Sequence, residues 1–316
     1  MRSPIRPPSS GFLPAIILSA AVLTLALLPR PGSAQEVFAD REILEPDRPE
    51  AWAMNYFTAT SFMTAFGETP AFGPGQWDLA LEFGHIPSLS ESQRNVGFNG
   101  FKNEDLNKSP VFGRARFSLG LPGRWVVELG YTPSLPINGL QAHNLFAAAF
   151  GRRWIDRDRF TLSSRVFGQH GSATGDITCP EELAGDPDPL RNPYGCQAAS
   201  HDTIRLNYYG LDMTPAWSRG AWQWHASIGV VRTEPEVQVD ALTFGFRDRS
   251  QLLARDVVPY LSAGFNLRMR EAWHVGVEVL YVPLTVRREE GAPEERDSLT
   301  SLRLRAGYRS RTATPH

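Results

Sequence analysis

The stretch QHGSATGD contains a residue pair of the types needed for hydrolysis, His170 and Ser172. A Ser hydroxyl becomes a useful nucleophile when a nearby base accepts its proton and a third group orients that base. Residues two apart on a strand share a face, so the pair could touch, but only two of the three roles are filled. In the cluster SHD at 200–202, neighbouring side chains would point apart. We assign no catalytic residue and keep His170 and Ser172 as weak candidates for a hydrolase.

Charged side chains form a second set that could do chemistry. A charged lining can select small solutes at a constriction, whereas paired charges can fill a narrow interior. Asp78 and Glu82 also have the residue type of catalytic acids. Carboxylates and guanidiniums are nearly balanced in the set, which consists of Asp78, Glu82, Arg114, Arg116, Glu128, Arg165, His225, His274, Glu278, Arg303 and Arg305.

The chain has two cysteines, Cys179 and Cys196, in an acidic segment rich in proline. No His flanks them at zinc-ligand spacing, and two thiolates alone make a poor metal site. An even pair in an exported chain favours a disulfide, with two free thiols as the alternative. Residues 95–108 lack the ligand spacing of a calcium loop. The sequence shows no nucleotide loop or haem motif either, so we expect no cofactor and no metal.

The charged residues lie on segments in which apolar and polar residues alternate. In GQWDLALEFGHIP, for example, Leu79, Leu81 and Phe83 take every second place between acidic or small residues. Alternation with period two predicts strands with one apolar and one polar face. At about ten residues or more, the segments are long enough for tilted strands that cross a bilayer. Ten strands are predicted, at 75–87, 111–121, 124–133, 143–154, 159–170, 203–217, 221–231, 257–269, 272–282 and 298–310.

The connections between the predicted strands alternate between short turns and long loops. This layout is typical of outer-membrane β-barrels, with all the long loops at one end. Tryptophan favours the membrane interface, where its ring is buried and its N–H stays hydrated. A girdle at the short-turn end is therefore predicted from six tryptophans that border a short turn or the first strand: Trp77, Trp125, Trp154, Trp217, Trp222 and Trp273.

Together these patterns resemble the bacterial outer-membrane β-barrel proteins over residues 76–311. The resemblance implies an all-β, antiparallel up-and-down barrel of about ten strands, with twelve as the alternative. Its polar face would point inward, because lipid cannot solvate charges. The first strand would pair with the second and the tenth, so we predict an ion-pair network at this seam. The resemblance also implies outer-membrane lipid, periplasmic chaperones and the barrel-assembly machinery as partners, and it leaves the oligomeric state open.

Residues 1–34 have the pattern of a secretory signal peptide, with basic residues, an apolar run and then small residues. We predict cleavage after Ala34 and residence in the bacterial outer membrane, with an uncleaved anchor as the alternative. The formal net charge is −2. Loss of Arg2, Arg6 and Arg30 lowers it by three, to −5. That mild acidity argues against nucleic acid as a partner.

The stretch before the first strand breaks the alternation. Trp52, Tyr56 and Ala59 follow helical spacing, with a Pro in the first turn. We predict a helix at about 49–66 inside an N-terminal periplasmic segment, 35–75, where it would plug the lumen or dock at its periplasmic mouth. With ten strands, both chain ends, including the C-terminal tail 312–316, are expected on the periplasmic side.

The predicted architecture favours a narrow or plugged channel or transporter for small solutes. The first alternative is a non-catalytic surface or envelope-anchoring protein with binding loops. The second is an outer-membrane hydrolase. A barrel of ten strands is small enough for side chains to fill its interior, because wide aqueous channels belong to barrels of about 16 strands or more.

Overall fold

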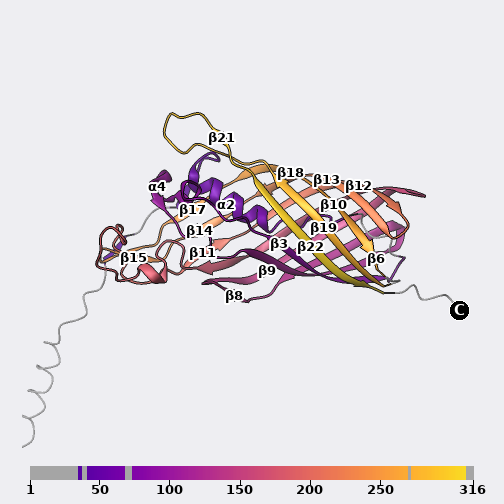
Figure 1. The fold of residues 1–316 in the computed structure, drawn as a ribbon, viewed down its shortest axis with the longest axis horizontal. Helices are drawn as coiled ribbons and strands as arrows, with labels where there is room; N and C mark the ends of the chain where they lie inside the picture. The colour runs from indigo at the N-terminus through magenta and orange to yellow at the C-terminus, as the bar shows by residue number, and fades with distance from the viewer. Residues whose placement is uncertain (1–34, 38–40, 68–72, 270–271, 311–316) are drawn as a thin grey trace, which may run out of the picture. The chain divides into compact units, whose positions relative to one another are not determined.

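The computed structural model describes residues 35–37, 41–67, 73–269 and 272–310 (Figure 1). Residues 36–316 form one compact unit, and the description below concerns that unit. The predicted signal peptide, 1–34, and the predicted tail, 312–316, lie outside the described residues. Within the described residues, no helix is both long and apolar enough to cross a bilayer.

Ten long antiparallel strands close into a barrel, as predicted. Each is hydrogen-bonded to the next, and β22 pairs with β3 from Arg303↔Gly84 to Arg309↔Asp78, which closes the ring. The alternative of twelve strands is wrong. The barrel strands are β3 (Trp77–His85), β6 (Val111–Leu121), β7 (Trp125–Thr132), β9 (Leu140–Arg157), β10 (Phe160–Gly175), β12 (Tyr208–Arg219), β13 (Trp222–Thr233), β18 (Asp256–Arg268), β19 (Trp273–Val282) and β22 (Leu299–Arg309).

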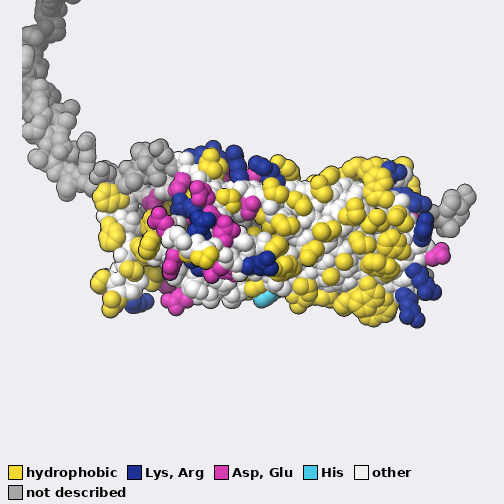
Figure 2. Space-filling view, turned by 90° about the horizontal axis from the view of Figure 1, so that it is seen from above, with side chains coloured by type: hydrophobic (Ala, Val, Ile, Leu, Met, Phe, Trp, Pro, Cys, Tyr) yellow, Lys and Arg dark blue, Asp and Glu magenta, His cyan; other side chains and the backbone are white. Residues whose placement is uncertain are grey.

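Alternation along each strand separates an apolar outer face from a polar inner face. On β3, Leu79, Leu81 and Phe83 are about half exposed, whereas Asp78 is fully buried. On the face seen in Figure 2, the outward apolar side chains cover one half of the molecule. An apolar outward band with a polar interior is the arrangement that allows a closed barrel to sit in lipid.

The two ends of the barrel differ. At the short-turn end, η1 (Pro122–Arg124) joins β6 to β7, and a tight turn at Gly220, with φ +63°, joins β12 to β13. At the long-loop end, the wall continues beyond the ring, because β10 pairs past β12 with β11, followed in order by β14, β17 and β2. The smaller elements at this end are β2 (Arg41–Ile43), α3 (Glu91–Arg94), β4 (Asn95–Val96), α4 (Gly97–Gly100), β5 (Lys102–Asn103), β8 (Pro136–Ile137), η2 (Glu181–Leu183), β11 (Asp202–Arg205), β14 (Glu236–Gln238), β15 (Ala241–Thr243), β16 (Phe246–Asp248), β17 (Gln251–Leu253), β20 (Thr285–Val286) and β21 (Glu295–Arg296); β1 (Gln35–Val37) precedes them in the chain.

The N-terminal segment fills the lumen from the long-loop end. Helix α2 (Pro49–Thr60) begins at that end (Figure 1). It is anchored there, because Trp52 Nε1 donates to the carbonyl of Asp297 at 2.8 Å and Tyr56 Oη donates to the carbonyl of Pro87 at 3.2 Å. The chain then runs along the interior to Phe66, whose carbonyl accepts from Asn266 near the short-turn end. We call residues 49–67 the plug.

This geometry corrects two expectations for the N-terminal segment. The helix ends at Thr60 instead of 66, because the side chains of Thr58, Thr60 and Ser61 hydrogen bond back to helical carbonyls and compete with the helical ladder. The segment also enters from the long-loop end, where β2 pairs in parallel with β17, and not from the short-turn end.

Aromatic side chains pack the plug against the inner wall. The ring of Phe62 lies 5.0 Å from that of Tyr208 and 6.1 Å from that of Tyr260, and all three side chains are buried. The barrel interior is therefore a packed core to which both the plug and the wall contribute apolar side chains.

Candidate functional site

A chain of alternating charges crosses the inner wall at the middle of the barrel. Arg116 forms ion pairs with Glu82, at 2.5 Å, and with Glu128. Glu128 lies 3.3 Å from Arg165, which in turn pairs with Asp212 at 2.5 Å. All five side chains are buried. Each charge has at least one opposite partner, which is the condition under which buried charges are tolerated.

Two further groups complete the inner charges. At the closing seam, Asp78 accepts from Arg305 at 2.8 Å, and His274 lies 3.4 Å away. Glu278 lies 3.2 Å from His225, and its other oxygen accepts from Thr64 of the plug at 2.5 Å. The structure thus brings the candidate acids against arginine, histidine and plug hydroxyl groups, and none of these acids faces an open cleft.

Arg303 donates hydrogen bonds to carbonyl groups at the C-terminal end of the plug helix. Its Nη1 donates to the carbonyl of Phe62 at 2.6 Å, and its Nη2 donates to the carbonyls of Thr60 at 3.0 Å and Ala59 at 3.3 Å. The last carbonyls of a helix lack partners within it, and a cation there also suits the helix dipole. Arg303 therefore stabilises the point at which α2 gives way to extended chain.

Three other inward arginines continue this pattern along the extended part of the plug. Each donates to one main-chain carbonyl, so the segment is held by its backbone in addition to the hydroxyl groups of Ser61 and Thr64. Tyr208 Oη also donates to the carbonyl of Ser61 and accepts from the N–H of Met63. The arginine contacts are Arg114 to Ser61 at 2.5 Å, Arg165 to Met63 at 2.8 Å and Arg116 to Thr64 at 3.0 Å.

Sequence reasoning missed several residues of this inner network, chiefly Asp212, Gln169, Tyr208 and Tyr260. Tyr260 Oη donates to Asp212 at 2.7 Å, and Gln169 accepts from Arg114 at 2.7 Å. Asp212 alternates regularly with the apolar residues Leu211 and Met213, but the apolar residues earlier in the segment 203–217 lie in the opposite phase, and this change obscures the inward face. Its opposition to Arg165 in the β10–β12 register is the signal that would have found it.

An apolar pocket lies in the barrel wall beside the plug. The β6–β7 ladder runs from Ala115↔Tyr131 to Leu121↔Trp125. Above it, residues 111–114 of β6 pair with β3, and within the described chain none of them pairs with β7. The chain after β7 turns instead to β8, which pairs with the start of β9. The wall is therefore open between β6 and the β7–β8 segment.

The pocket at this opening has a volume of about 350 Å³. Phe57, Thr60 and Ser61 of the plug form its inner side, and Arg114 lies between the pocket and the lumen. Phe57 is the residue of α2 that is not fully buried. The apolar lining consists mainly of Leu81, Phe83, Ile86, Leu106, Val111, Phe112, Pro133, Leu135, Ile137, Leu140, Leu145, Ile177, Ile204 and Leu206.

The hydrolase candidates do not form a catalytic arrangement. His170 is exposed on the outer face of β10, and a bulge between it and Ser172 interrupts the register with β9. Within the part of the chain that the structure describes, no hydrogen bond joins the two side chains or links His170 to an orienting carboxylate. The described residues also hold no group of three His, Cys, Asp or Glu side chains suited to a metal ion.

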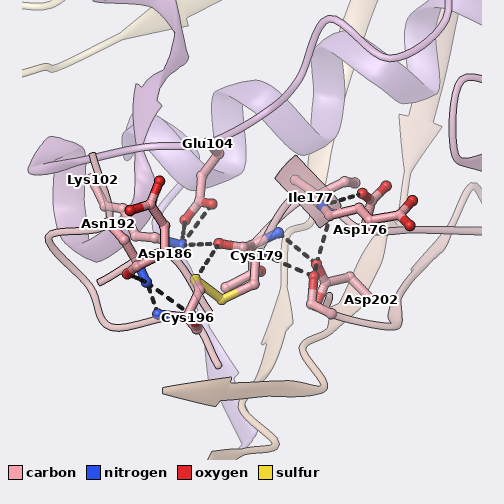
Figure 3. Close-up of a disulfide and its surroundings, with 12 residues drawn as sticks. Lys102, Glu104, Asp176, Ile177, Cys179, Asp186, Asn192, Cys196 and Asp202 are labelled. Atoms are coloured by element: carbon pink, nitrogen blue, oxygen red, sulfur yellow. Dashed lines mark hydrogen bonds and ion pairs between the residues drawn. A yellow bond between two sulfur atoms is a disulfide. The ribbon is translucent and has the colours of Figure 1, made fainter. Parts of the chain in front are cut away.

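The two cysteines form the expected disulfide, with 5.7 Å between their Cα atoms. It closes a loop at the long-loop end, where Lys102 Nζ donates to the carbonyl of Thr178 at 2.7 Å and to Glu104 (Figure 3). Asp202 accepts from the N–H groups of Ile177 and Thr178 and ties the base of the loop to β11.

The six tryptophans of the predicted girdle all lie at the short-turn end of their strands, and five of them are well exposed on the outer face. Trp125 is the exception, because its ring stacks on Phe150 at 4.7 Å and lies under the guanidinium of Arg152. The exposed members are Trp77, Trp154, Trp217, Trp222 and Trp273.

No family model matches the chain, and no curated protein matches it. Among solved structures, it is similar to the outer membrane protease OmpT of Escherichia coli at 9% identity, a TM-score of 0.39 and coverage of 77% of this chain and 98% of that one. It is also similar to the translocator domain of the autotransporter NalP from Neisseria meningitidis, at 11% identity, a TM-score of 0.41 and coverage of 77% of this chain and 90% of that one. A third similar structure is the toluene transporter TodX of Pseudomonas putida, at 10% identity, a TM-score of 0.33 and coverage of 88% of this chain and 99% of that one. The closed ring of ten strands and its apolar outer band make this chain a β-barrel of the bacterial outer-membrane class.

Proposed function

We propose that the protein transports a small apolar solute through the opening in its wall, beside the plug, and not along its axis. The observation that carries this proposal is the apolar pocket of about 350 Å³ between β6 and the β7–β8 segment. That volume is within the usual range of small-molecule sites, about 300–1,000 Å³. In this proposal the barrel resides in the outer membrane after removal of residues 1–34, with its long loops at the cell surface.

The packed lumen supports a lateral path over an axial one. The arginine–carboxylate chain and the plug occupy the interior. Wall arginines donate hydrogen bonds to main-chain carbonyls of plug residues 61–64. An ion that moved along the axis would have to break these contacts in a region of low dielectric, where each is costly to lose. A solute in the side pocket avoids them.

The lining favours an uncharged solute. Most of the pocket surface comes from aliphatic and aromatic side chains. The charged residues at its margins already have partners, because Arg114 donates to the carbonyl of Ser61 and to Gln169, and Lys108 forms an ion pair with Asp105 at 2.6 Å. Burial of apolar surface would provide the binding free energy, at about 25 cal/mol per Å². A charged solute would lose hydration without gaining a partner.

The pocket also extends toward the long-loop end. A small cavity of about 30 Å³ lies between residues 86–89 and 106–110 and shares Phe57 and Leu106 with the main pocket. The aromatic ring of Tyr56 borders it. A solute could therefore approach along α2 from the loops and leave sideways into lipid, or travel the same path in reverse.

The test is a variant that fills the opening. Gly113 lies on the outer face of β6, and a Cβ there would meet the ring of Phe83 at 3.6 Å, an ordinary contact. We expect Gly113→Phe to fold and to slow the uptake of an apolar fluorescent probe, N-phenylnaphthylamine, into cells that express the barrel. Leu211→Phe, on the lipid-facing surface of β12, is the matched control and should leave uptake unchanged.

Conductance in planar bilayers separates the lateral path from an axial channel. The proposal expects little ionic current from the intact protein. Steady current through the wild-type barrel that survives in Gly113→Phe, together with equal probe uptake by the two proteins, would refute the lateral path. Uptake no greater than in cells without the barrel would refute transport of apolar solutes altogether.

A further inference from the structure

Exposed phenylalanines gather at the tip of the long-loop end, away from the lipid-facing band. Phe98, Phe101 and Phe244 are 63%, 82% and 66% exposed. The tip in Figure 2 shows hydrophobic side chains in contact with solvent, with acidic side chains beside them. Large exposed apolar patches are uncommon on soluble surfaces unless they bind something.

Contacts with one loop join these rings into a continuous surface. The ring of Tyr194 lies 6.1 Å from that of Phe98, and its hydroxyl donates to the carbonyl of Phe101 at 3.1 Å. On the other side, the N–H of Phe244 donates to the carbonyl of Gly195 at 3.0 Å. A side chain at Gly195 would collide with the ring of Phe244, so glycine is what allows this ring to lie against the loop. We call Phe98, Phe101, Tyr194 and Phe244 the aromatic strip.

The backbone is strained where it presents two of these rings. Phe98 has φ +52° and Phe244 has φ +49°, in the left-handed region that bulky residues seldom occupy. Such a conformation is costly for a residue with a bulky side chain, and it adds to the cost of leaving a phenyl ring in water. Backbone strain that holds apolar side chains in solvent indicates a surface formed for binding.

The framework behind the strip is rigid. Tyr194 lies in the loop closed by the Cys179–Cys196 disulfide, and the ammonium of Lys102 sits 5.4 Å from the centre of its ring. The main-chain N–H and carbonyl of Cys196 are also both hydrogen-bonded to the side-chain amide of Asn192. A surface that is already ordered loses little conformational entropy on binding.

The disulfide-closed loop that carries Tyr194 has more acidic than basic residues. Residues 176–202 contain six carboxylates and one arginine. Glu181 and Glu182 are exposed, and Asp186 and Asp188 belong to the same disulfide-closed loop as Tyr194. This sign would repel the anionic headgroups of a lipid surface, and it would attract a basic partner over a distance of about 10 Å at moderate salt.

We propose that the aromatic strip binds a basic, amphipathic segment of a polypeptide outside the cell. Apolar side chains of the segment would cover Phe98, Phe101 and Phe244. Its Lys or Arg side chains would reach the acidic residues of the disulfide loop and stack on the aromatic rings. This binding function is separate from solute transport through the barrel wall.

The test uses the purified full-length protein in detergent, with its disulfide intact, and a fluorescent synthetic peptide of alternating Lys and Leu. We expect saturable binding, seen as a rise in fluorescence anisotropy, that weakens several-fold when salt is raised from about 50 to 300 mM. The double variant Phe98→Ser with Phe101→Ser should weaken binding by about tenfold or more. Ile43→Ser is the matched control, because Ile43 is 64% exposed at the same end but belongs to β2.

Peptide composition distinguishes the proposed partner from other ligands. A Glu–Leu peptide should not bind if the acidic surroundings matter, and a Lys–Ser peptide should bind weakly if the rings matter. Equal binding of the Lys–Ser and Lys–Leu peptides would overturn the role of the strip and leave general charge attraction. Equal binding of the Glu–Leu peptide, or unchanged affinity in the double Phe variant, would overturn the proposal as well.

Discussion

The inward arginines differ in the kind of acceptor that they contact. Arg116 and Arg165 each contact two carboxylates, whereas Arg303 makes its hydrogen bonds to three plug carbonyls and the hydroxyl of Thr64. A guanidinium has five N–H donors in a fixed fork, so it can join a wall strand to several main-chain acceptors at once. Lysine could not replace Arg303 in this arrangement.

We expect Arg303→Met to loosen the plug. The substitution keeps an unbranched side chain but leaves the carbonyls of Ala59, Thr60 and Phe62 without this donor in a buried site. The free energy of unfolding in urea should fall by about 2–4 kcal/mol, since each orphaned buried acceptor costs about 1–3 kcal/mol. Leu304→Met, one residue away on the lipid face, should change it by about 0.5 kcal/mol or less. Equal effects of the two substitutions would contradict a specific hold on the plug.

Glu104 gives the disulfide loop a pH dependence. Burial raises its pKa from 4.5 to about 7, against the opposing influence of Lys102, and the nearby carboxylates of Asp202 and Glu50 add to the rise. A raised carboxyl pKa means that the folded state binds the proton more tightly than the unfolded state. The contribution of Glu104 to stability is therefore greatest below pH 4.5 and is lost as pH rises through about 7.

Hydrogen exchange of residues 176–202 measures this dependence. After correction for intrinsic rates, amide protection should fall between about pH 5 and 7.5 in the wild type. In Glu104→Gln, which keeps the shape of the side chain and removes its titration, protection should be nearly flat over the same interval. A wild-type slope that persists in Glu104→Gln would assign the effect to another group.

At the scale of elements, the strands and a helix from residue 49 could be predicted from the sequence, whereas the end from which the plug enters the barrel could not. Leu79, Leu81 and Phe83 alternate with inward residues over the full length of β3, and lipid outside with charge inside enforces that alternation. Helix α2 is buried on nearly all sides, so its polar residues Asn55 and Thr58 are as fully buried as its aromatic residues Trp52 and Tyr56. Its sequence therefore shows no single apolar face that would indicate where it docks.

Strand parity gave the wrong end for the N-terminal segment for a physical reason. Parity counts passages made by strands, but residues 61–67 also cross part of the barrel, as extended chain inside the lumen. Away from water, such a segment needs hydrogen-bond partners for its backbone. Here Arg114, Arg116 and Arg165 supply the donors from the wall. These partners cannot be predicted from the sequence of the segment itself.

The opening in the barrel wall between β6 and the β7–β8 segment could not be predicted from the sequence either. The alternation in 124–133 and 143–154 predicts two strands and a loop between them, but not which neighbour the loop would pair with. The chain at Pro136 and Ile137 pairs with the start of β9 and so moves away from β6. This pairing is a local hairpin around Asn138 and Gly139, both with positive φ. What periodicity does not encode is whether residues 111–114 of β6 find a partner across the wall, because that pairing is tertiary.

Asn107 is expected to fasten the loop side of the pocket. Its side-chain oxygen accepts from the N–H of Leu89 at 2.8 Å, and its amide donates to the carbonyl of the same residue at 2.9 Å. These two bonds hold residues 86–89 against 106–110 above the small cavity. Asn107→Ala should speed probe uptake about two- to tenfold, because opening would no longer cost two hydrogen bonds of about 1 kcal/mol each.

Asn103→Ala is the control for this variant. Asn103 also bridges loop segments, through Glu91 and Asn95, but it does not line either cavity. Uptake should stay at the wild-type rate. If both variants speed uptake equally, general loosening of the loops, and not the bonds of Asn107 to Leu89, would explain the result.

At the scale of the whole molecule, the long-loop end differs from the rest in construction. The barrel wall extends past the ring through β11, β14 and β17, and the N-terminal strand β2 completes this extension in parallel register with β17. Leu44 then continues the contact, with its N–H donating to the carbonyl of Leu253 at 2.8 Å. The N-terminal segment is thus structurally part of the loop lobe before it becomes the plug.

The direction in which the chain threads the barrel can be measured on intact cells. The native cysteines are both in the disulfide, so single introduced cysteines report position without background. Ile43→Cys on β2 and Leu190→Cys in the disulfide loop are exposed at the long-loop end, and Arg219→Cys lies at the short-turn end. A membrane-impermeant maleimide should label Cys at 43 and 190 in intact cells, and at 219 only after the outer membrane is permeabilised.

The pattern of labelling, and not its extent, decides between arrangements. Labelling at 190 but not at 43 would mean that the plug enters from the periplasmic end and that β2 does not join β17. Labelling at 219 alone would mean that the barrel is inserted with its long loops facing the periplasm, which would also remove the aromatic strip from the cell surface. Joint labelling at 43 and 190 requires the N-terminal segment to lie outside while β3 begins inside. The link between them must then pass through the lumen, because both ends of a plug anchored by Trp52 and Phe66 are fixed at opposite ends of the barrel.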